Sequence, residues 1–197
     1  MSRPQLSVLI PAAGASRRLG QIKQLVRYGS GTLIQNAVKS ANSINPLEIM
    51  VITGAYAEEI RDTVHHACVR WVHNPQWSEG LGGSIATGVV NIHPDSSGLL
   101  ILLCDQWRIQ AQDLQALVKI WDAAPERIVV AETGGQYMPP VIFPSTLFKQ
   151  LRALKGDTGA RSLFNSHPDL MTPVSLENAA FDLDTHTHLA LLRSSGL

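Results

Sequence analysis

Leu6-Ser7-Val8-Leu9-Ile10, followed at once by Pro11-Ala12-Ala13-Gly14-Ala15-Ser16-Arg17-Arg18-Leu19-Gly20-Gln21-Ile22-Lys23, is the stretch that decides the fold of this chain. The run Leu6–Ile10 is continuously apolar, which is typical of a strand covered on both faces. The loop Pro11–Lys23 is built from small residues, two arginines and a lysine. Small residues let the backbone approach a ligand, and backbone N–H groups beside fixed positive charge bind anions. This strand and loop therefore predict a polyphosphate site.

Predicted strands and helices alternate along the rest of the chain, which favours a three-layer α/β domain with a mostly parallel sheet. The predicted strands are Leu6–Ile10, Glu48–Thr53, Trp71–His73, Leu99–Cys104, Arg127–Glu132, Val141–Phe143 and Ala180–Leu183. The predicted helices are Thr32–Ser43, Ala57–His66, Ile85–Ile92, Gln112–Trp121, Pro144–Leu154, Thr158–Ser166 and a last helix through Leu192 that Thr185 caps. Ligands bind such sheets at the carboxyl ends of the strands. The loop Pro11–Lys23, the segment near Asn74 and Asp105 are therefore expected to share one crevice.

Composition limits the class of protein. The chain has 197 residues, of which 45% are hydrophobic and 16% charged, so we expect one compact domain spanning 1–197. A formal net charge of zero argues against nucleic acid as a partner. No apolar run approaches the roughly 20 residues of a membrane span, and the N-terminus has no signal-peptide pattern. Cys68 and Cys104 have no motif spacing, so we expect reduced, buried thiols and a cytoplasmic protein.

Two common nucleotide motifs are missing. The loop contains neither G-x-x-x-x-G-K-[ST] nor G-x-G-x-x-G, so the local signatures of ATP hydrolysis and of dinucleotide binding are absent. Taken alone, the loop is also compatible with a glycine turn that carries solvated arginines.

Five segments, taken in their order along the chain, favour a functional loop over a solvated glycine turn. They are Ala12–Lys23, Asn74–Gly80 with Ser84, Leu103–Gln106, Leu154–Arg161 and Phe181–Thr185. The first resembles the signature A-A-G-x-S-x-R-x-G-x-x-K, and the others resemble N-x-x-W-x-x-G-x-x-x-S, a strand-end D-Q pair, G-D-x-G-A-R and D-I-D-T. Together they resemble the MobA-like nucleotidyltransferase family, in particular its molybdenum cofactor cytidylyltransferase branch, over nearly the whole chain.

The resemblance implies a Rossmann-like α/β/α sandwich of the nucleotide-diphospho-sugar transferase type. It implies a Mg²⁺-dependent reaction in which CTP donates CMP to a molybdopterin-type phosphate acceptor and pyrophosphate leaves. A molybdoenzyme or its chaperone is then a further candidate partner. Ala13 resembles the CTP branch, whereas a glycine is usual there in the GTP branch.

The resemblance also suggests a role for each motif residue. Arg18, Lys23 and Asp105 are candidate catalytic residues, with the two cations stabilising phosphate charge. Asp105 and Asp184 are the candidate Mg²⁺ ligands, and Asp182 is a lesser candidate. The candidate nucleotide-binding residues are Ala12, Ala13, Gly14, Asn74, Gly80 and Ser84.

Structural alternatives stay open for several of these residues. Ser84 is also placed to cap a helix, Asp184 with Thr185 is also a good helix start, and Asp157 with Arg161 is spaced as a helical ion pair. Arg17 is expected at the surface. The histidines lack metal-ligand spacing and are expected to be surface residues. Trp71, Trp77 and Trp121 are expected to pack in the core.

Two departures concern the acceptor. Trp107 follows Asp105-Gln106 where Pro is usual, and Met138 stands where a glycine is usual, so both are expected to shape the acceptor pocket. A sugar phosphate or alcohol phosphate acceptor therefore remains an alternative. So does a non-catalytic protein that binds the cofactor or hands it to a target enzyme.

Overall fold

The computed structural model describes residues 4–65, 68–157 and 159–195. A central sheet has the strand order β5-β4-β1-β6-β8-β7-β9. Its strands are β1 (Leu6–Pro11), β4 (Glu48–Thr53), β5 (Val69–His73), β6 (Gly98–Ile101), β7 (Ile128–Thr133), β8 (Gln136–Pro144) and β9 (Met171–Ser175). Strand β8 runs antiparallel to β6 and β7, and the other neighbours are parallel. The predicted three-layer α/β/α sandwich with a mostly parallel sheet is confirmed.

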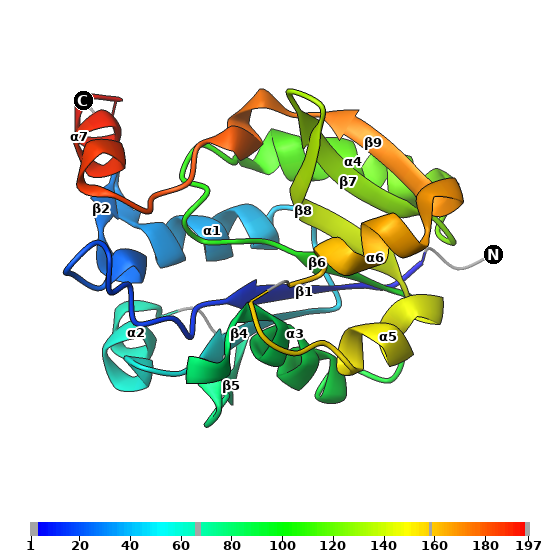
Figure 1. Cartoon of the computed structure of the whole chain (residues 1–197), viewed down its shortest axis with the longest axis horizontal. Coiled ribbons are helices and arrows are strands. Elements are labelled where there is room, and N and C mark those ends of the chain that lie inside the picture. Colours follow the sequence, from blue (N-terminus) through cyan, green and yellow to red (C-terminus); the bar gives the residue numbers. More distant parts are fainter. Residues whose placement is uncertain (1–3, 66–67, 158, 196–197) are drawn as a thin grey trace.

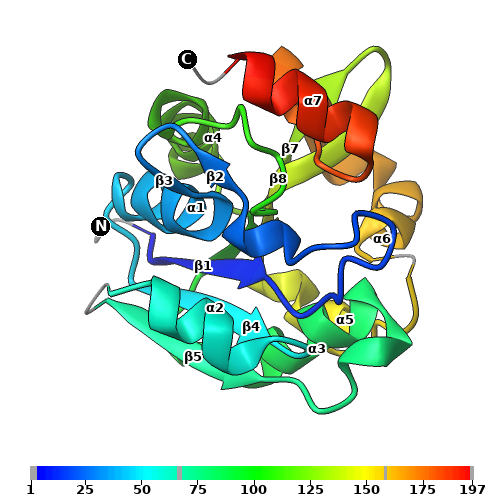
Figure 2. The same ribbon diagram turned by 90° about the vertical axis from the view of Figure 1, so that its left-hand side faces the viewer.

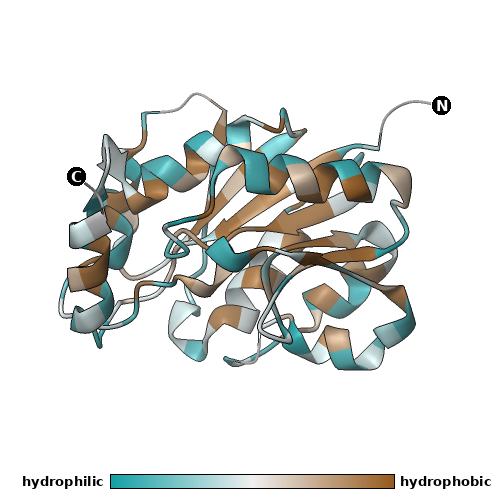
Figure 3. Cartoon of the chain, turned by 90° about the horizontal axis from the view of Figure 1, so that it is seen from above, coloured by the Kyte–Doolittle hydropathy of each residue, from teal (hydrophilic) through white to brown (hydrophobic). Residues whose placement is uncertain are grey.

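Helices cover both faces of this sheet (Figure 1). The helices α1 (Leu33–Asn42), α2 (Ala57–Thr63) and α4 (Ala111–Ala123) pack on one face, where their buried residues join Val8, Ile10 and Val51. The helices α3 (Leu81–Val90), α5 (Phe148–Arg152) and α6 (Arg161–Ser166) pack on the other face with Leu9, Met50 and Ile52. Apolar colour concentrates in the strands between these layers (Figure 3). Alternate residues of β1 and β4 thus enter opposite cores, which explains why both strands are continuously apolar.

A third, smaller cluster lies at the end of the molecule to which β1 points. Here α7 (His186–Ser195) packs through Leu189 and Leu192 against Leu19 of the opening loop and against Trp107. The short hairpin β2 (Arg27–Tyr28) and β3 (Gly31–Thr32) lies beside it (Figure 2). Residues from both ends of the chain therefore hold the opening loop in place.

Helix starts follow the sequence signals. Thr32 and Gln35 form a capping box at α1, with the Thr32 N–H donating to Gln35 Oε1 at 2.8 Å. Thr185 Oγ1 accepts from the His188 N–H at 3.2 Å, which confirms Thr185 as the cap of α7. No helix in the described ranges is long and apolar enough to cross a membrane.

Some predicted boundaries are wrong. Strand β6 ends at Ile101 rather than Cys104, and β8 extends to both sides of the predicted Val141–Phe143. Ala180–Leu183 forms only one bridge, between Asp182 and Gln106, instead of a strand. The sequence analysis missed β9, a strand interrupted by Pro173. His66 and Thr158, at the ends of two predicted helices, lie outside the described residues.

The predicted helix Pro144–Leu154 is shorter in the structure. The segment Ser145–Leu147 is a 3-10 turn, η3, and α5 begins only at Phe148. Further 3-10 turns are η1 (Lys23–Leu25), η2 (Trp77–Glu79), η4 (Pro168–Leu170) and η5 (Glu177–Ala180). Two of them, η1 and η2, carry residues of the cavity described next.

Candidate active site

The carboxyl ends of β1 and β6 enclose a cavity of about 400 Å³. The chain leaves β1 toward β4 and β5 on one side and returns to β6 on the other side, so the sheet's order reverses between these two strands. A crevice opens at such a switch point, and ligands of α/β sheets bind there. The cavity wall includes these candidate site residues: Ala13, Gly14, Arg18, Lys23, Gly80, Ser84, Asp105 and Asp184.

Lys23 is clamped between two carboxylates in this cavity. Its Nζ donates to Asp105 Oδ2 at 2.5 Å and to Asp184 Oδ1 at 3.0 Å. The three side chains are only 18%, 17% and 30% exposed, so solvent screens their attraction weakly. Residues separated by 82 and 161 positions in sequence thus meet at one ammonium group.

Burial and charge act in opposite directions on these groups. Burial disfavours the ammonium form of Lys23, but the Asp105 and Asp184 carboxylates outweigh it and raise the pKa of Lys23 above its usual range. Burial would raise the pKa of Asp184, yet the Lys23 hydrogen bond and charge, with Arg18 beyond, hold it below the usual value. Lys23 and Asp184 are therefore both charged at neutral pH.

Arg18 is held much more loosely. Its Nη2 lies 3.7 Å from Asp184 Oδ2, and 79% of its side chain is exposed. An exposed guanidinium on the rim of a cavity is free to turn toward an incoming anion. Arg17 is also exposed, as predicted.

Asp182 belongs to the same acidic group without touching Lys23. Its burial and the neighbouring charge of Asp184 raise the pKa of Asp182 above the usual value. The backbone of Asp182 pairs with Gln106, which places this residue beside Asp105. The alternative that Asp184 and Thr185 start a helix is confirmed for Thr185, which caps α7, while the Asp184 side chain pairs with Lys23 and Arg18 instead.

The site also has a helix terminus. The helix α3 begins at Leu81 beside the cavity, and Gly80 before it has φ = +116°. A Cβ at Gly80 would lie 2.4 Å from Asp157 Oδ1, so only glycine fits. Ser84 is the fourth residue of α3 and does not cap it; its Oγ accepts from Asn74 Nδ2 at 3.1 Å. The capping alternative for Ser84 is therefore wrong.

Two candidate residues lie behind the cavity wall rather than in it. Asn74 is 2% exposed, and it joins Ser84 to the backbone N–H of Gln76. Ala12 is 1% exposed, and its carbonyl accepts from Gln24 Nε2 at 3.0 Å. Both positions support the wall that Ser84 and Gly14 form.

The predicted acceptor residues are not in the cavity wall. Trp107 is 6% exposed and packs edge-on against Tyr28 and Phe181, so its expected role at the crevice is wrong. Met138 packs against the core where β8 pairs with β7 at Ala131. Both side chains pack against apolar neighbours instead of lining this cavity.

Asp157 does reach the cavity, but it does not form the helical pair expected with Arg161. Asp157 lies in the loop before α6, and Arg161 is the first residue of that helix. The loop carbonyl of Gly156 accepts from the Gly82 N–H at 2.8 Å, which brings the Asp157 segment against the start of α3.

The expectations for the tryptophans and the cysteines are confirmed in part. Trp121 is fully buried as predicted, but Trp77 lines the cavity. Cys104 is buried and Cys68 is exposed, so burial of both thiols was a wrong expectation.

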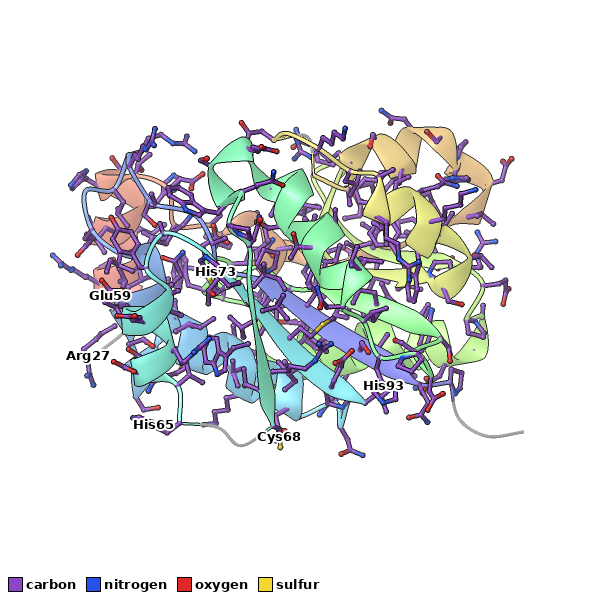
Figure 4. All side chains as sticks on the ribbon, turned by 90° about the horizontal axis from the view of Figure 1, so that it is seen from below. Arg27, Glu59, His65, Cys68, His73 and His93 are labelled. Carbon is purple, nitrogen blue, oxygen red and sulfur yellow. The ribbon has the colours of Figure 1, made fainter. Side chains whose placement is uncertain are left out.

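The histidines labelled in Figure 4, His65, His73 and His93, come from separate segments. Among the described residues no three His, Cys, Asp or Glu side chains form a group that could hold a metal by themselves. A Mg²⁺ ion in this cavity would complete its coordination with water or substrate oxygens.

The sequence analysis missed Gln24 and Ser16. Gln24 is 3% exposed and bonds the carbonyls of Ala12 and Gly14, and Ser16 adopts φ = +51° beside it. The sequence offers no clear signal for Gln24, because only its burial in the structure shows that its amide needs partners.

Fold and cavity together define an α/β protein with a polar, charged cavity at its switch point. Residues 8–170 match the MobA-like NTP transferase domain, and the chain belongs to that family. Family membership supports a nucleotidyltransferase enzyme.

Three relatives show the range of proteins to which this sequence is similar. The chain is 31% identical over 183 residues to the purine catabolism protein PucB of Bacillus subtilis, covering 84% of this chain and 83% of that protein. It is 28% identical to nicotine blue oxidoreductase of Paenarthrobacter nicotinovorans, covering 92% and 93%. It is 23% identical to the molybdenum cofactor cytidylyltransferase of Escherichia coli, covering 92% and 91%. These names span different activities, so membership does not decide the acceptor.

Solved structures support the fold. The chain superposes on Rv0371c of Mycobacterium tuberculosis with a TM-score of 0.84 at 24% identity, covering 98% of both chains. A complex of Rv0371c with manganese aligns with a TM-score of 0.78 at 21% identity, covering 97% of this chain and 98% of that one.

Proposed function

We propose that this protein transfers a nucleoside monophosphate from a nucleoside triphosphate, CTP in preference, to a molybdopterin-type phosphate monoester, with release of pyrophosphate. The observation that carries the proposal is the Lys23 ammonium held between Asp105 and Asp184 at the sheet's switch point. The A-A-G form of the loop and the E. coli cytidylyltransferase among the relatives support the CTP and molybdopterin assignments.

The protein's part in this reaction is positioning and charge. Nucleotidyl transfer is an in-line attack of the acceptor phosphate on the α-phosphorus, and negative charge grows on the leaving pyrophosphate. Lys23 supplies a point charge inside the cavity, and Arg18 supplies forked donors at its rim. The start of α3 adds the positive end of a helix dipole beside the same space. Gly80 and Ser84 are proposed to face the ribose and base.

The carboxylates fit a divalent cation. Asp105 Oδ1 is buried and has no hydrogen-bond partner among the described residues, while Asp184 lies across Lys23 from it. Mg²⁺ takes one or two carboxylates together with substrate phosphates and water. Asp105 and Asp184 would hold Mg²⁺, which would neutralise phosphate charge, and the manganese complex of Rv0371c supports a divalent metal here.

The wider proposal is a single 1–197 domain acting in the cytoplasm, with a molybdoenzyme or its chaperone receiving the product. The free thiols Cys68 and Cys104 support a reducing compartment. Fractionation of cells that express the tagged protein tests the compartment, and recovery outside the cytoplasm would contradict it.

The decisive experiment measures pyrophosphate release in Mg²⁺ with CTP or GTP against molybdopterin, a sugar phosphate and an alcohol phosphate. We expect release with CTP and molybdopterin, and a loss of about 100-fold or more in Asp105→Asn, as when a group that stabilises transition-state charge is removed. Arg17→Gln, at an exposed rim residue, is the matched control and should change little. Release only with a sugar phosphate or alcohol phosphate would move the acceptor to that class. Tight nucleotide binding without release under any condition would favour a cofactor-carrying role.

A further inference from the structure

The loop between β1 and η1 has no regular secondary structure, so something else must fix its backbone. Gln24 lies under this loop, 3% exposed, as the central residue of η1. Its Nε2 donates to the carbonyl of Ala12 at 3.0 Å and to the carbonyl of Gly14 at 3.1 Å. One side-chain amide thus holds two backbone carbonyls that lie two residues apart.

Holding those carbonyls also orients two N–H groups. In a planar trans peptide the N–H points opposite to the preceding C=O. With the carbonyls of Ala12 and Gly14 turned toward Gln24, the N–H groups of Ala13 and Ala15 must point away from it. Neither N–H has an acceptor within the described chain, and both residues line the cavity. Two backbone donors without partners are therefore available to an anion.

Ser16 completes the same network. It adopts φ = +51°, which is uncommon for a residue with a Cβ. Its Oγ accepts from the Lys23 N–H at 3.2 Å and donates to Gln24 Oε1 at 3.4 Å. The donor and acceptor groups of the Gln24 side chain are therefore both hydrogen bonded to the loop. Through Ser16, the loop is also bonded to the backbone of Lys23, which carries the ammonium group.

We propose that Gln24 is a positioning residue, which turns the Ala13 and Ala15 N–H groups into the cavity so that they bind the triphosphate of the nucleotide. The inference rests on the proposed nucleotidyltransferase function. It adds a residue of the cavity wall that shapes the phosphate-binding backbone through its bonds to the Ala12 and Gly14 carbonyls. Lys23 and Gln24, neighbours in η1, then have separate tasks, with one supplying charge and the other loop geometry.

The test compares binding of inorganic tripolyphosphate, CTP and cytidine, measured by calorimetry in Mg²⁺, in the wild type, four single variants and one double variant. Gln24→Met keeps the side-chain length and removes both donors. We expect its affinity for tripolyphosphate and CTP to fall about 10-fold or more, as for the loss of roughly two hydrogen bonds to an anion. Binding of cytidine, which has no phosphate, should change less than about 2-fold. Gln21→Met changes an exposed glutamine of the same loop and should leave all three affinities unchanged.

Ser16→Ala and Gln24→Glu keep the proposal testable if Gln24→Met does not fold. Ser16→Ala should lower the affinity for tripolyphosphate and CTP selectively, but to a smaller degree. The double variant of Ser16→Ala with Gln24→Met should bind them no more weakly than Gln24→Met alone, because both residues act on one network. Gln24→Glu keeps the acceptor for Ser16 but sets a carboxylate against two carbonyls, so it should also lose phosphate binding selectively.

The outcomes separate the two proposals. Wild-type protein that binds neither tripolyphosphate nor any nucleoside triphosphate overturns the proposed function. Wild-type protein that binds them, with folded Gln24 variants that bind them equally well or that lose cytidine in parallel, overturns the role of Gln24. In the enzyme assay a positioning role predicts a raised KM for nucleotide with an unchanged KM for acceptor.

Discussion

Replacing Lys23 with methionine isolates the energy of the charge cluster. Methionine keeps an unbranched side chain but removes the ammonium that contacts Asp105 at 2.5 Å and Asp184 at 3.0 Å. Both carboxylates would remain in the cavity wall without a cation between them. The variant should therefore be less stable than the wild type at neutral pH.

The size of this loss follows from burial. A hydrogen bond to a charged group contributes about 1.5–3 kcal/mol, and removing one partner of a fully buried pair costs about 3–5 kcal/mol. Asp105 and Asp184 keep 17% and 30% of their side-chain exposure, so water recovers part of their solvation. We expect the free energy of unfolding to fall by about 2–3 kcal/mol at pH 7, between those limits. With a urea m-value of about 2 kcal/mol/M, the midpoint should fall by about 1–1.5 M.

The loss must also depend on pH. The lowered pKa of Asp184 stabilises the wild type above the unfolded carboxyl pKa of about 3.9, and that contribution is lost as pH falls through the folded value. The raised pKa of Lys23 stabilises the wild type below the unfolded lysine pKa of about 10.4, and that contribution is lost as pH rises through the folded value. The difference between wild type and Lys23→Met should be full at pH 7 and should shrink when the pH is lowered below about 4.

Urea denaturation followed by circular dichroism at pH 7 and pH 3.5 measures both quantities. Arg18→Met is the matched control in the same loop, because Arg18 is 79% exposed and 3.7 Å from Asp184, and it should change stability by less than about 0.5 kcal/mol. Equal losses for the two variants, or a loss for Lys23→Met that is the same at both pH values, would show that the Lys23 pairs do not carry this energy.

Three further predictions test the metal site, the core and the thiols. Adding Mg²⁺ without nucleotide should raise the melting temperature of Lys23→Met more than that of the wild type, because the cation replaces the ammonium; an equal shift would argue against metal binding by these carboxylates. Gly88→Ala should lower the free energy of unfolding by about 1–3 kcal/mol, because its Cβ would lie 2.0 Å from Leu9 Cδ1 in a packed core, and an unchanged urea midpoint would contradict that packing. A thiol reagent at pH 8 should modify the exposed Cys68 rapidly and Cys104 only on unfolding, since burial raises the pKa of Cys104 to about 12; rapid reaction of both thiols would refute this.

The sequence predicted which residues of the opening loop meet in the cavity because this part of the cavity is local in sequence. Strand β1 is an unbroken apolar run, and the loop that follows it holds Gly14, Arg18 and Lys23 at fixed spacing. Because this loop directly follows β1, its residues must lie near the carboxyl end of that strand. The prediction that Asp105 lies beside this loop is confirmed. Although β6 ends four residues before Asp105, the carboxyl ends of β1 and β6 lie side by side.

Contacts over long distances in sequence were harder to predict. Nothing in the pattern Phe181–Thr185 shows that Asp184 approaches Lys23, since the contact depends on how α7 packs on Leu19 and Trp107. The same packing buries Trp107, which the sequence placed at the crevice. The order and direction of β7, β8 and β9 could not be predicted either, because the apolar pattern of a strand does not show which way the strand runs.

The two sides of the sheet are built differently. On one side the carboxyl ends of parallel strands converge on the cavity, and the Lys23 cluster joins them to the C-terminal segment. The far side of the sheet is built on antiparallel β8 and the β7–β8 hairpin, which turns at Gly134 and Gly135. Gln106 connects the two, since its Nε2 donates to the carbonyls of Pro139 and Ala179. Under the proposed function, changes in the hairpin would alter the acceptor while the Gln106 bonds keep Asp105 in place, which is consistent with relatives whose names span several activities.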